Sequence, residues 1–189
     1  MANSRLFILF LWVSLKLYSQ EDSSWQTKPT LELTGFVDAF YVYDFNKPTG
    51  MTRQDFFFNH NRHNDFSVNL ALMKLVVKHE KYRANLALQA GAYVTDNYAA
   101  EPNALKNIHE ANVGLSISKK NKLWIDLGVL PSYLGFESAV STENYTLTRS
   151  LIAENSPYYL SGAKVTYKPN EKWEIAGLVM NGWQRLQRC

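Results

Sequence analysis

The sequence predicts an all-β protein, an antiparallel transmembrane β-barrel with meander topology, and three observations support this. Residues 83–95 (RANLALQAGAYVT) alternate between apolar and polar or small side chains, as the two faces of a strand require. Comparable segments recur about seven times and approach the roughly 9–11 residues that a membrane-crossing strand needs. The connections between them alternate between long and short, as in outer-membrane barrels.

Composition narrows the class of protein. The chain has 189 residues and a net charge of +3, from 20 basic and 17 acidic residues, which is too small to indicate a nucleic-acid partner. No stretch approaches the roughly 18 consecutive apolar residues of a transmembrane helix. The single cysteine, Cys189, has no partner for a disulfide within the chain. A closed barrel needs none, because closure pairs every backbone group.

The amino-terminal residues are typical of a secretory signal peptide. A basic start that includes Arg5 precedes the apolar residues 6–15, and the acidic Glu21 and Asp22 follow. We therefore predict a signal peptide at 1–20, a flexible leader at 21–30 and a partial outer-membrane barrel at 31–189. The alternative is an uncleaved membrane anchor.

The first two strands are predicted at 31–43 and 64–77. Asp38 falls in the middle of the first strand, where a charge facing lipid would cost a few kcal/mol, so the period places it in the lumen. In the second strand, one lipid-facing set is expected at Phe66, Val68, Leu70 and Leu72. The alternation falters at Lys74, which indicates either snorkelling toward the membrane edge or a β-bulge.

The third strand is predicted at 83–95, with Leu86 and Leu88 facing lipid and Asn85 and Gln89 facing water. Four further strands follow, at 110–118, 123–130, 159–167 and 173–182. Short lysine-rich turns are expected at 78–81, 119–122 and 168–172, and long loops at 45–63, 96–109 and 131–157. This alternation favours an amino terminus on the periplasmic side.

Seven strands is an odd number, whereas bacterial single-chain barrels have even counts. An open barrel would also leave two unpaired edges in lipid, at several kcal/mol for each unsatisfied backbone group. We therefore expect the amino-terminal portion of a longer barrel. The alternative is an eight-stranded barrel with one weak strand overlooked.

Several motifs resemble a known family. They include LTGFVDAFYVYDFN at 33–46, NRHNDFSVNLALMKL at 61–75, NYAAEPNALKNIHEANVG at 97–114, LPSYLGFES at 130–138, LTRSLIAENSPYYLSGAKVTY at 147–167 and NGWQR at 181–185. From 33 to 188 the chain is similar to outer-membrane β-barrel porins of the OmpL-like group. The resemblance implies a pore-forming barrel, longer than this chain, in the outer membrane.

The functional candidates are charged side chains of the lumen, since fixed charges in a pore select ions by sign. The wall and constriction candidates are Asp38, Arg83, Asp126, Glu137, Arg149, Glu154 and Lys164. The alternative is a salt-bridged network that only keeps the interior soluble.

The segment 131–157 is the strongest regional candidate, because long loops in compact domains are usually functional or disordered. Its apolar residues favour a folded loop, and Ser141 or Thr142 could cap a short helix that extends through Leu151. If the loop folds into the barrel, its charged residues line a constriction. The alternative is an external cap with no contact to the pore.

Signals for an enzyme are weak. The sequence lacks GxSxG, HExxH, P-loop and CxxC motifs. His60 and His63 have a spacing that could support a metal, but a pair of loop histidines is usually solvated. We predict a porin for passive diffusion of small hydrophilic solutes, without enzymatic activity or a cofactor, in contact with outer-membrane lipid. The alternatives are a barrel enzyme of the phospholipase or protease type and a structural or adhesive barrel without an open pore.

Overall fold

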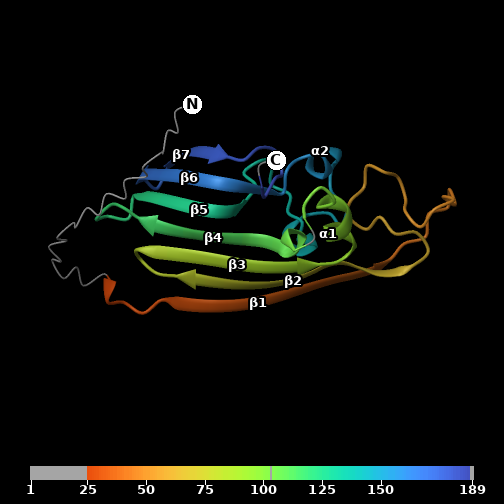
Figure 1. Ribbon diagram of the computed structural model, residues 1–189, viewed down its shortest axis with the longest axis horizontal. Coiled ribbons are helices and arrows are strands. Elements are labelled where there is room, and N and C mark those ends of the chain that lie inside the picture. The colour runs from red at the N-terminus through yellow and green to blue at the C-terminus, as the bar shows by residue number, and fades with distance from the viewer. Residues whose placement is uncertain (1–24, 103, 188–189) are drawn as a thin grey trace, which may run out of the picture.

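The computed structural model describes residues 25–102 and 104–187, which form one antiparallel sheet of seven strands in chain order. The predicted meander is confirmed (Figure 1). The predicted signal peptide at 1–20 lies outside the described residues. The strands are β1 (Thr30–Tyr41), β2 (Phe66–Lys78), β3 (Tyr82–Ala90), β4 (Ile108–Ser116), β5 (Leu123–Pro131), β6 (Tyr159–Asn170) and β7 (Trp173–Met180).

The connections separate to opposite ends of the sheet, as predicted. The three short turns lie at one end, which we call the turn end, and the long loops lie at the other, the loop end (Figure 1). The loops contain α1 (Ala92–Asn97), α2 (Leu151–Glu154) and two short 3₁₀ turns, η2 (Leu105–Asn107) and η3 (Ser141–Glu143). The predicted helix from Ser141 or Thr142 through Leu151 is wrong. The chain instead makes η3, and α2 then starts after Ser150, whose hydroxyl accepts a hydrogen bond from the Ala153 amide.

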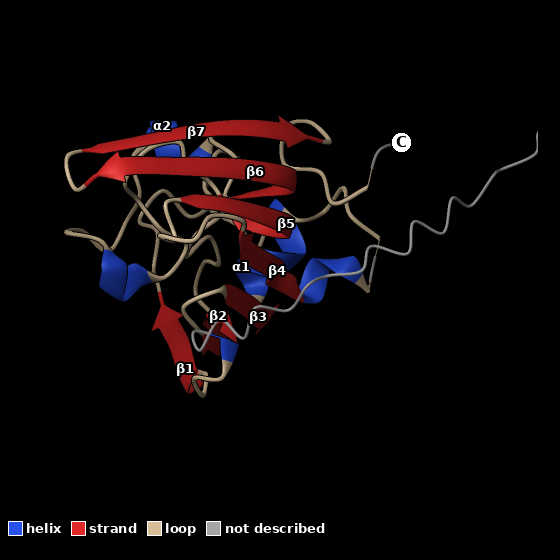
Figure 2. Cartoon of the chain, turned by 90° about the vertical axis from the view of Figure 1, so that its left-hand side faces the viewer, coloured by secondary structure: helices blue, strands red, loops and turns tan. Residues whose placement is uncertain are grey.

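The sheet is curved but not closed. Seen from the turn end, it bends and twists from β1 to β7 (Figure 2). Within the described residues β1 pairs only with β2 and β7 only with β6. Both edges therefore present unpaired backbone groups, which a hydrocarbon environment does not tolerate.

A β-bulge in β2 overturns part of the predicted face assignment. Asp38 pairs with Leu70, whereas the next residue of β1 pairs with Val68, so Asn69 is the extra residue. Beyond it the alternation shifts by one, and Leu70 and Leu72 face inward instead of toward lipid. The irregularity that the sequence placed at Lys74 therefore originates five residues earlier.

The third strand is shorter than predicted. It ends at Ala90, and residues 92–97 form α1. Gly91 makes this change of direction, with φ of 135° and a backbone so close to Asn69 that a Cβ would lie 2.3 Å from its carbonyl oxygen. The turn directs Tyr93 and Val94 into a buried cluster, so Val94 does not face lipid as its position in the repeat suggested.

An apolar core fills the loop end. It combines Leu70 of β2, three residues of the second loop (Tyr93, Val94 and Tyr98), Ala139 and Val140 of the third loop and Tyr159 of β6. Phe36 and Leu72, on β1 and β2, pack against it. The face of the sheet that carries Leu70 and Phe36 is therefore covered by loops at the loop end, and we call it the inner face.

Candidate functional site

The outer face of the sheet is apolar across its whole width. One row of paired residues crosses all seven strands, and each member is apolar: Leu31, Val77, Ala84, Val113, Leu127, Ala163 and Val179. Neighbouring rows add Leu33, Met73, Leu75, Leu86 and Leu88, all exposed. Large exposed apolar surfaces are rare on soluble monomers, so this face is typical of contact with lipid or with another protein.

The adjacent row, one residue along each strand, lies on the inner face, and four of its seven members are charged. Its members are Thr30, Lys78, Arg83, Gly114, Asp126, Lys164 and Leu178. Three of the seven predicted site residues, Arg83, Asp126 and Lys164, therefore lie together in one line across β3 to β6. The alternation of side chains along each strand was enough to predict their face. Only the pairing of the strands shows that they lie side by side.

Arg83 and Asp126 form the central contact of this row. The guanidinium donates from Nε to Oδ1 at 2.7 Å and from Nη2 to Oδ2 at 2.6 Å. It also lies 4.5 Å from the centre of the Trp124 ring. The two residues are separated by β4, and the pair can form only because residue 114 is glycine, where a Cβ would lie 2.2 Å from Asp126 Oδ1.

Other charges of the wall are matched in the same way. Lys74 bridges from β2 to Glu110 of β4 at 2.6 Å, across the fully buried Ala87. At the turn end, Lys78 contacts Glu32, and Lys168 contacts Glu174. Lys164 is in no ion pair of the described residues, so no carboxylate in direct contact neutralises its ammonium.

Asp38 lies at the loop end, apart from this row, in a buried polar network. Its Oδ2 accepts hydrogen bonds from His60 Nε2 at 2.8 Å and from Asn69 Nδ2 at 3.1 Å. His60 is only 3% exposed, so the expectation that this histidine is solvated is wrong. The network fixes the first long loop to the walls of β1 and β2.

Glu154 extends this network to the third loop. Its carboxylate accepts from the Phe58 amide at 2.9 Å and from Asn59 Nδ2 at 3.0 Å. It is 3% exposed, although it lies in the short helix α2. Glu154 therefore acts as a link between two loops and presents little charge to a pore.

Arg149 is used structurally as well. The buried guanidinium donates to three backbone carbonyls of its own loop, those of Ser138, Ala139 and Leu147, at 2.6–2.7 Å. These contacts hold the loop around Ala139, which packs in the apolar core. The segment 131–157 therefore folds against the inner face.

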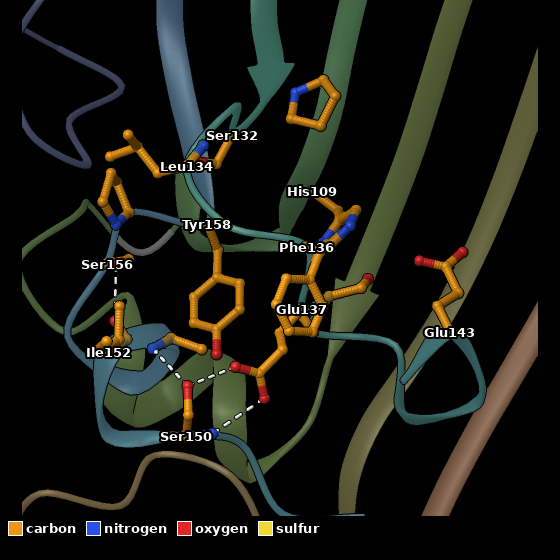
Figure 3. A pocket seen from close by; sticks show the side chains of 16 residues that line it. His109, Ser132, Leu134, Phe136, Glu137, Glu143, Ser150, Ile152, Ser156 and Tyr158 are labelled. Atoms are coloured by element: carbon orange, nitrogen blue, oxygen red, sulfur yellow. Dashed lines mark hydrogen bonds between the residues drawn. The ribbon is translucent and has the colours of Figure 1, made fainter. Parts of the chain in front are cut away.

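Glu137 is the predicted charge of this loop that stays accessible. It accepts hydrogen bonds from the backbone amide and the hydroxyl of Ser150. These two bonds hold the pKa of the Glu137 carboxyl below its usual value. Glu137 also lines a pocket of about 500 Å³ between the two halves of the loop (Figure 3).

Sequence reasoning missed the bridging roles in this site. The alternation placed Asn69 in the lumen and the sequence singled out His60 only as a possible metal ligand, while Gly114 gave no signal. Each of the three acts through a bulge, a loop or a cross-strand contact, which a local pattern does not show. In the described part of the chain, no group of three His, Cys, Asp or Glu residues could hold a metal ion. Nor is any helix there long and apolar enough to cross a membrane.

Comparison with known proteins now places this two-faced sheet in a class. Residues 30–188 match the model of the family described as "Putative beta-barrel porin-2, OmpL-like". The chain belongs to this family of β-barrel porins, as its motifs suggested. No curated protein and no solved structure matches it.

Proposed function

We propose that this chain forms part of the wall and the external loops of an outer-membrane pore for small hydrophilic solutes. The observation that carries the proposal is the pair of adjacent rows, one apolar on the outer face and one charged on the inner face. Transmembrane barrels with an aqueous interior have this arrangement. Family membership supports it.

Closure of the pore constrains the strands that must join these seven. Because β1 and β7 are separated by an even number of antiparallel steps, they run in the same direction. Only an odd number of further strands allows every pairing in the barrel to be antiparallel. A ring of two copies, related by an axis along the pore, would instead place β7 of one copy parallel to β1 of the next.

Solutes would cross by diffusion along the inner face, and the pore uses no covalent chemistry. Cross-strand ion pairs neutralise most of the charges there, so width rather than net charge is expected to dominate selection. The folded third loop narrows the lumen at the loop end, where Ala139 and Val140 reach the core that contains Leu70.

Conductance in a planar bilayer tests the proposal. The full chain should fractionate with outer membranes, lose its first 19 or 20 residues, and give voltage-driven ion currents after reconstitution. Deletion of residues 143–148, at the tip of the third loop, should increase the conductance. Outer-membrane location without current would contradict the pore and favour a structural or adhesive barrel. Turnover of lipid or peptide would favour a barrel enzyme.

A further inference from the structure

The third loop encloses a pocket that the pore itself does not require. It has a volume of about 500 Å³ and lies between residues 131–139 and residues 150–158, with His109 of β4 at one side. This volume is within the roughly 300–1,000 Å³ typical of small-molecule sites. Figure 3 shows the Glu137, Ser150 and Tyr158 side chains converging in it, with Glu143 farther to one side.

Most of the surface of this pocket is apolar. Leu134, Phe136 and Ile152 line it, and all three are exposed, Phe136 to 83%. An external loop gains nothing by presenting such side chains to water. Exposed apolar groups around a concavity with a few polar groups are typical of a binding site.

The charges of the pocket have one sign. The lining includes two carboxylates, Glu137 and Glu143, and neither lysine nor arginine is found among the described residues that line it. The nearby guanidinium of Arg149 is buried against three backbone carbonyls. Its donor groups are therefore used within the loop and it does not line the pocket, while its charge contributes to the lowered pKa of Glu137.

The Glu137 carboxylate is held in place and can still accept hydrogen bonds from a cation. Ser150 donates its amide and hydroxyl to the carboxylate, one to each oxygen. Each carboxylate oxygen keeps a further lone pair for another donor. Phe136 and Tyr158 add aromatic rings to the same pocket, and the faces of aromatic rings attract cations.

The hydroxyl of Tyr158 gives a second, independent indication of a ligand. Its oxygen is buried and makes no well-formed hydrogen bond with the described residues, although Asn59 lies near it. A buried polar atom without a partner destabilises the fold unless a water or ligand completes it. A ligand that bears a hydrogen-bonding group beside its apolar portion would do so.

From this geometry we infer that the pocket binds a small organic cation, an ammonium or guanidinium group joined to an apolar portion. The ammonium lies against the Glu137 carboxylate, and the apolar portion packs among Phe136, Ile152 and Leu134. This inference rests on the proposed function, because the pocket lies at the loop end of the proposed pore. It would make the loop a recognition site at the mouth for cationic solutes.

The test uses three probes that share one ring and differ in charge: phenethylammonium, 2-phenylethanol and phenylacetate. Binding to the purified full chain is measured by titration calorimetry in detergent. Phenethylammonium should bind, and Glu137→Gln should weaken it about tenfold, by loss of a charge-assisted contact. The matched control is Glu171→Gln, which makes the same change at an exposed position in the β6–β7 turn. It should leave the affinity for phenethylammonium unchanged.

Phe136→Leu keeps the test falsifiable if Glu137→Gln disturbs the loop, because the highly exposed Phe136 ring does not support the fold. It should weaken phenethylammonium binding several-fold, by loss of the aromatic face. Equal binding of the amine and the alcohol, or no effect of either pocket variant, would overturn the inference. The absence of phenethylammonium binding would also overturn the inference and would mean that further strands fill the pocket.

Conductance measured on the same preparations separates the two proposals. Ion current without amine binding would refute the cation site and leave the pore intact. Amine binding that depends on Glu137 without any current would refute the pore and leave the site as that of a closed barrel.

Discussion

The turn end and the loop end of this sheet use the same strands but hold their inner faces by different means. At the turn end, charged side chains pair across the strands, as Arg83 of β3 and Asp126 of β5 do over Gly114 of β4. At the loop end, apolar side chains from three loops bury Leu70 and Tyr93. The first arrangement leaves a polar surface exposed, whereas the second fills the space.

This difference changes which residues can act on a solute. The sequence placed Arg149, Glu154 and Glu137 at a constriction, but Arg149 and Glu154 are buried and engaged in holding loops. In the proposed pore, a narrowing at the loop end would therefore come from packed backbone and apolar groups, and substitution of either residue should loosen the loops more than it shifts ion selectivity. Lys164 on the wall is better placed to affect selectivity.

The largest expected effect concerns the loop-end core. Leu70→Ala should destabilise the folded chain by about 2–5 kcal/mol, because it leaves a cavity at a fully buried position. The matched variant Leu88→Ala, on the half-exposed outer face, should cost much less. Denaturant unfolding in lipid vesicles measures both. Equal costs would mean that Leu70 faces lipid and that the bulge at Asn69 is absent.

A charge on the outer face should have the next largest effect. Leu33 pairs with Leu75, which pairs with Leu86 at the middle of β3, so Leu33 lies near mid-height. Leu33→Arg should destabilise the assembled barrel by about 2–4 kcal/mol. Thr34→Arg, also exposed but on the inner face, should cost little. Similar losses for both in the same unfolding assay would show that the two faces meet the same solvent.

The ion pairs of the wall should differ in their coupling free energy. A double-mutant cycle with Arg83→Met and Asp126→Asn should give a coupling of about 1–2 kcal/mol, because Asp126 is buried while Arg83 stays partly hydrated. The same cycle on the exposed pair Lys168 and Glu174 should give less than about 0.5 kcal/mol. A stronger coupling at the exposed pair would contradict the account of the wall.

The smallest effect is a pH dependence of the third loop. Hydrogen bonds from Ser150 lower the pKa of Glu137 below 4.5. Their contribution is therefore complete above about pH 4.5 and is lost as the pH falls through the lowered pKa. Protease cleavage within 141–148 should accelerate in that range, and Glu137→Gln should remove this part of the acceleration. An unchanged profile in the variant would mean that Glu137 does not hold the loop.

Much of the wall could be predicted from the sequence, because the alternation of inward and outward side chains is set locally along each strand. The faces of Leu86, Asp126 and Lys164 follow from it directly. The bulge at Asn69 could not be predicted, since it depends on partners elsewhere in the chain: Asn69 contacts Asp38 of β1 and Asn59 and His60 of the first loop. The end of β3 was missed for a related reason, as the alternation continues through Tyr93 and Val94 while Gly91 turns the chain away.

The candidate site was predicted less completely. All seven charged residues could be named from the sequence, but burial decides which of them meet solvent. Burial of Arg149 depends on how its own loop folds, and burial of Glu154 depends on amide groups of the first loop. The pocket beside Glu137 also needs both halves of the loop and the wall at His109. No pattern of neighbouring residues in the sequence predicts that these distant segments form one pocket.

The opposite environments of the two faces can be measured directly on β1, where Leu31, Glu32, Leu33 and Thr34 are all exposed. Single cysteines at these positions, with Cys189 replaced by serine, would carry spin labels in lipid vesicles. The account predicts high oxygen accessibility at 31 and 33, and high accessibility to a water-soluble nickel reagent at 32 and 34. Equal access of the nickel reagent to all four labels would contradict a membrane wall with one lipid face and one aqueous face.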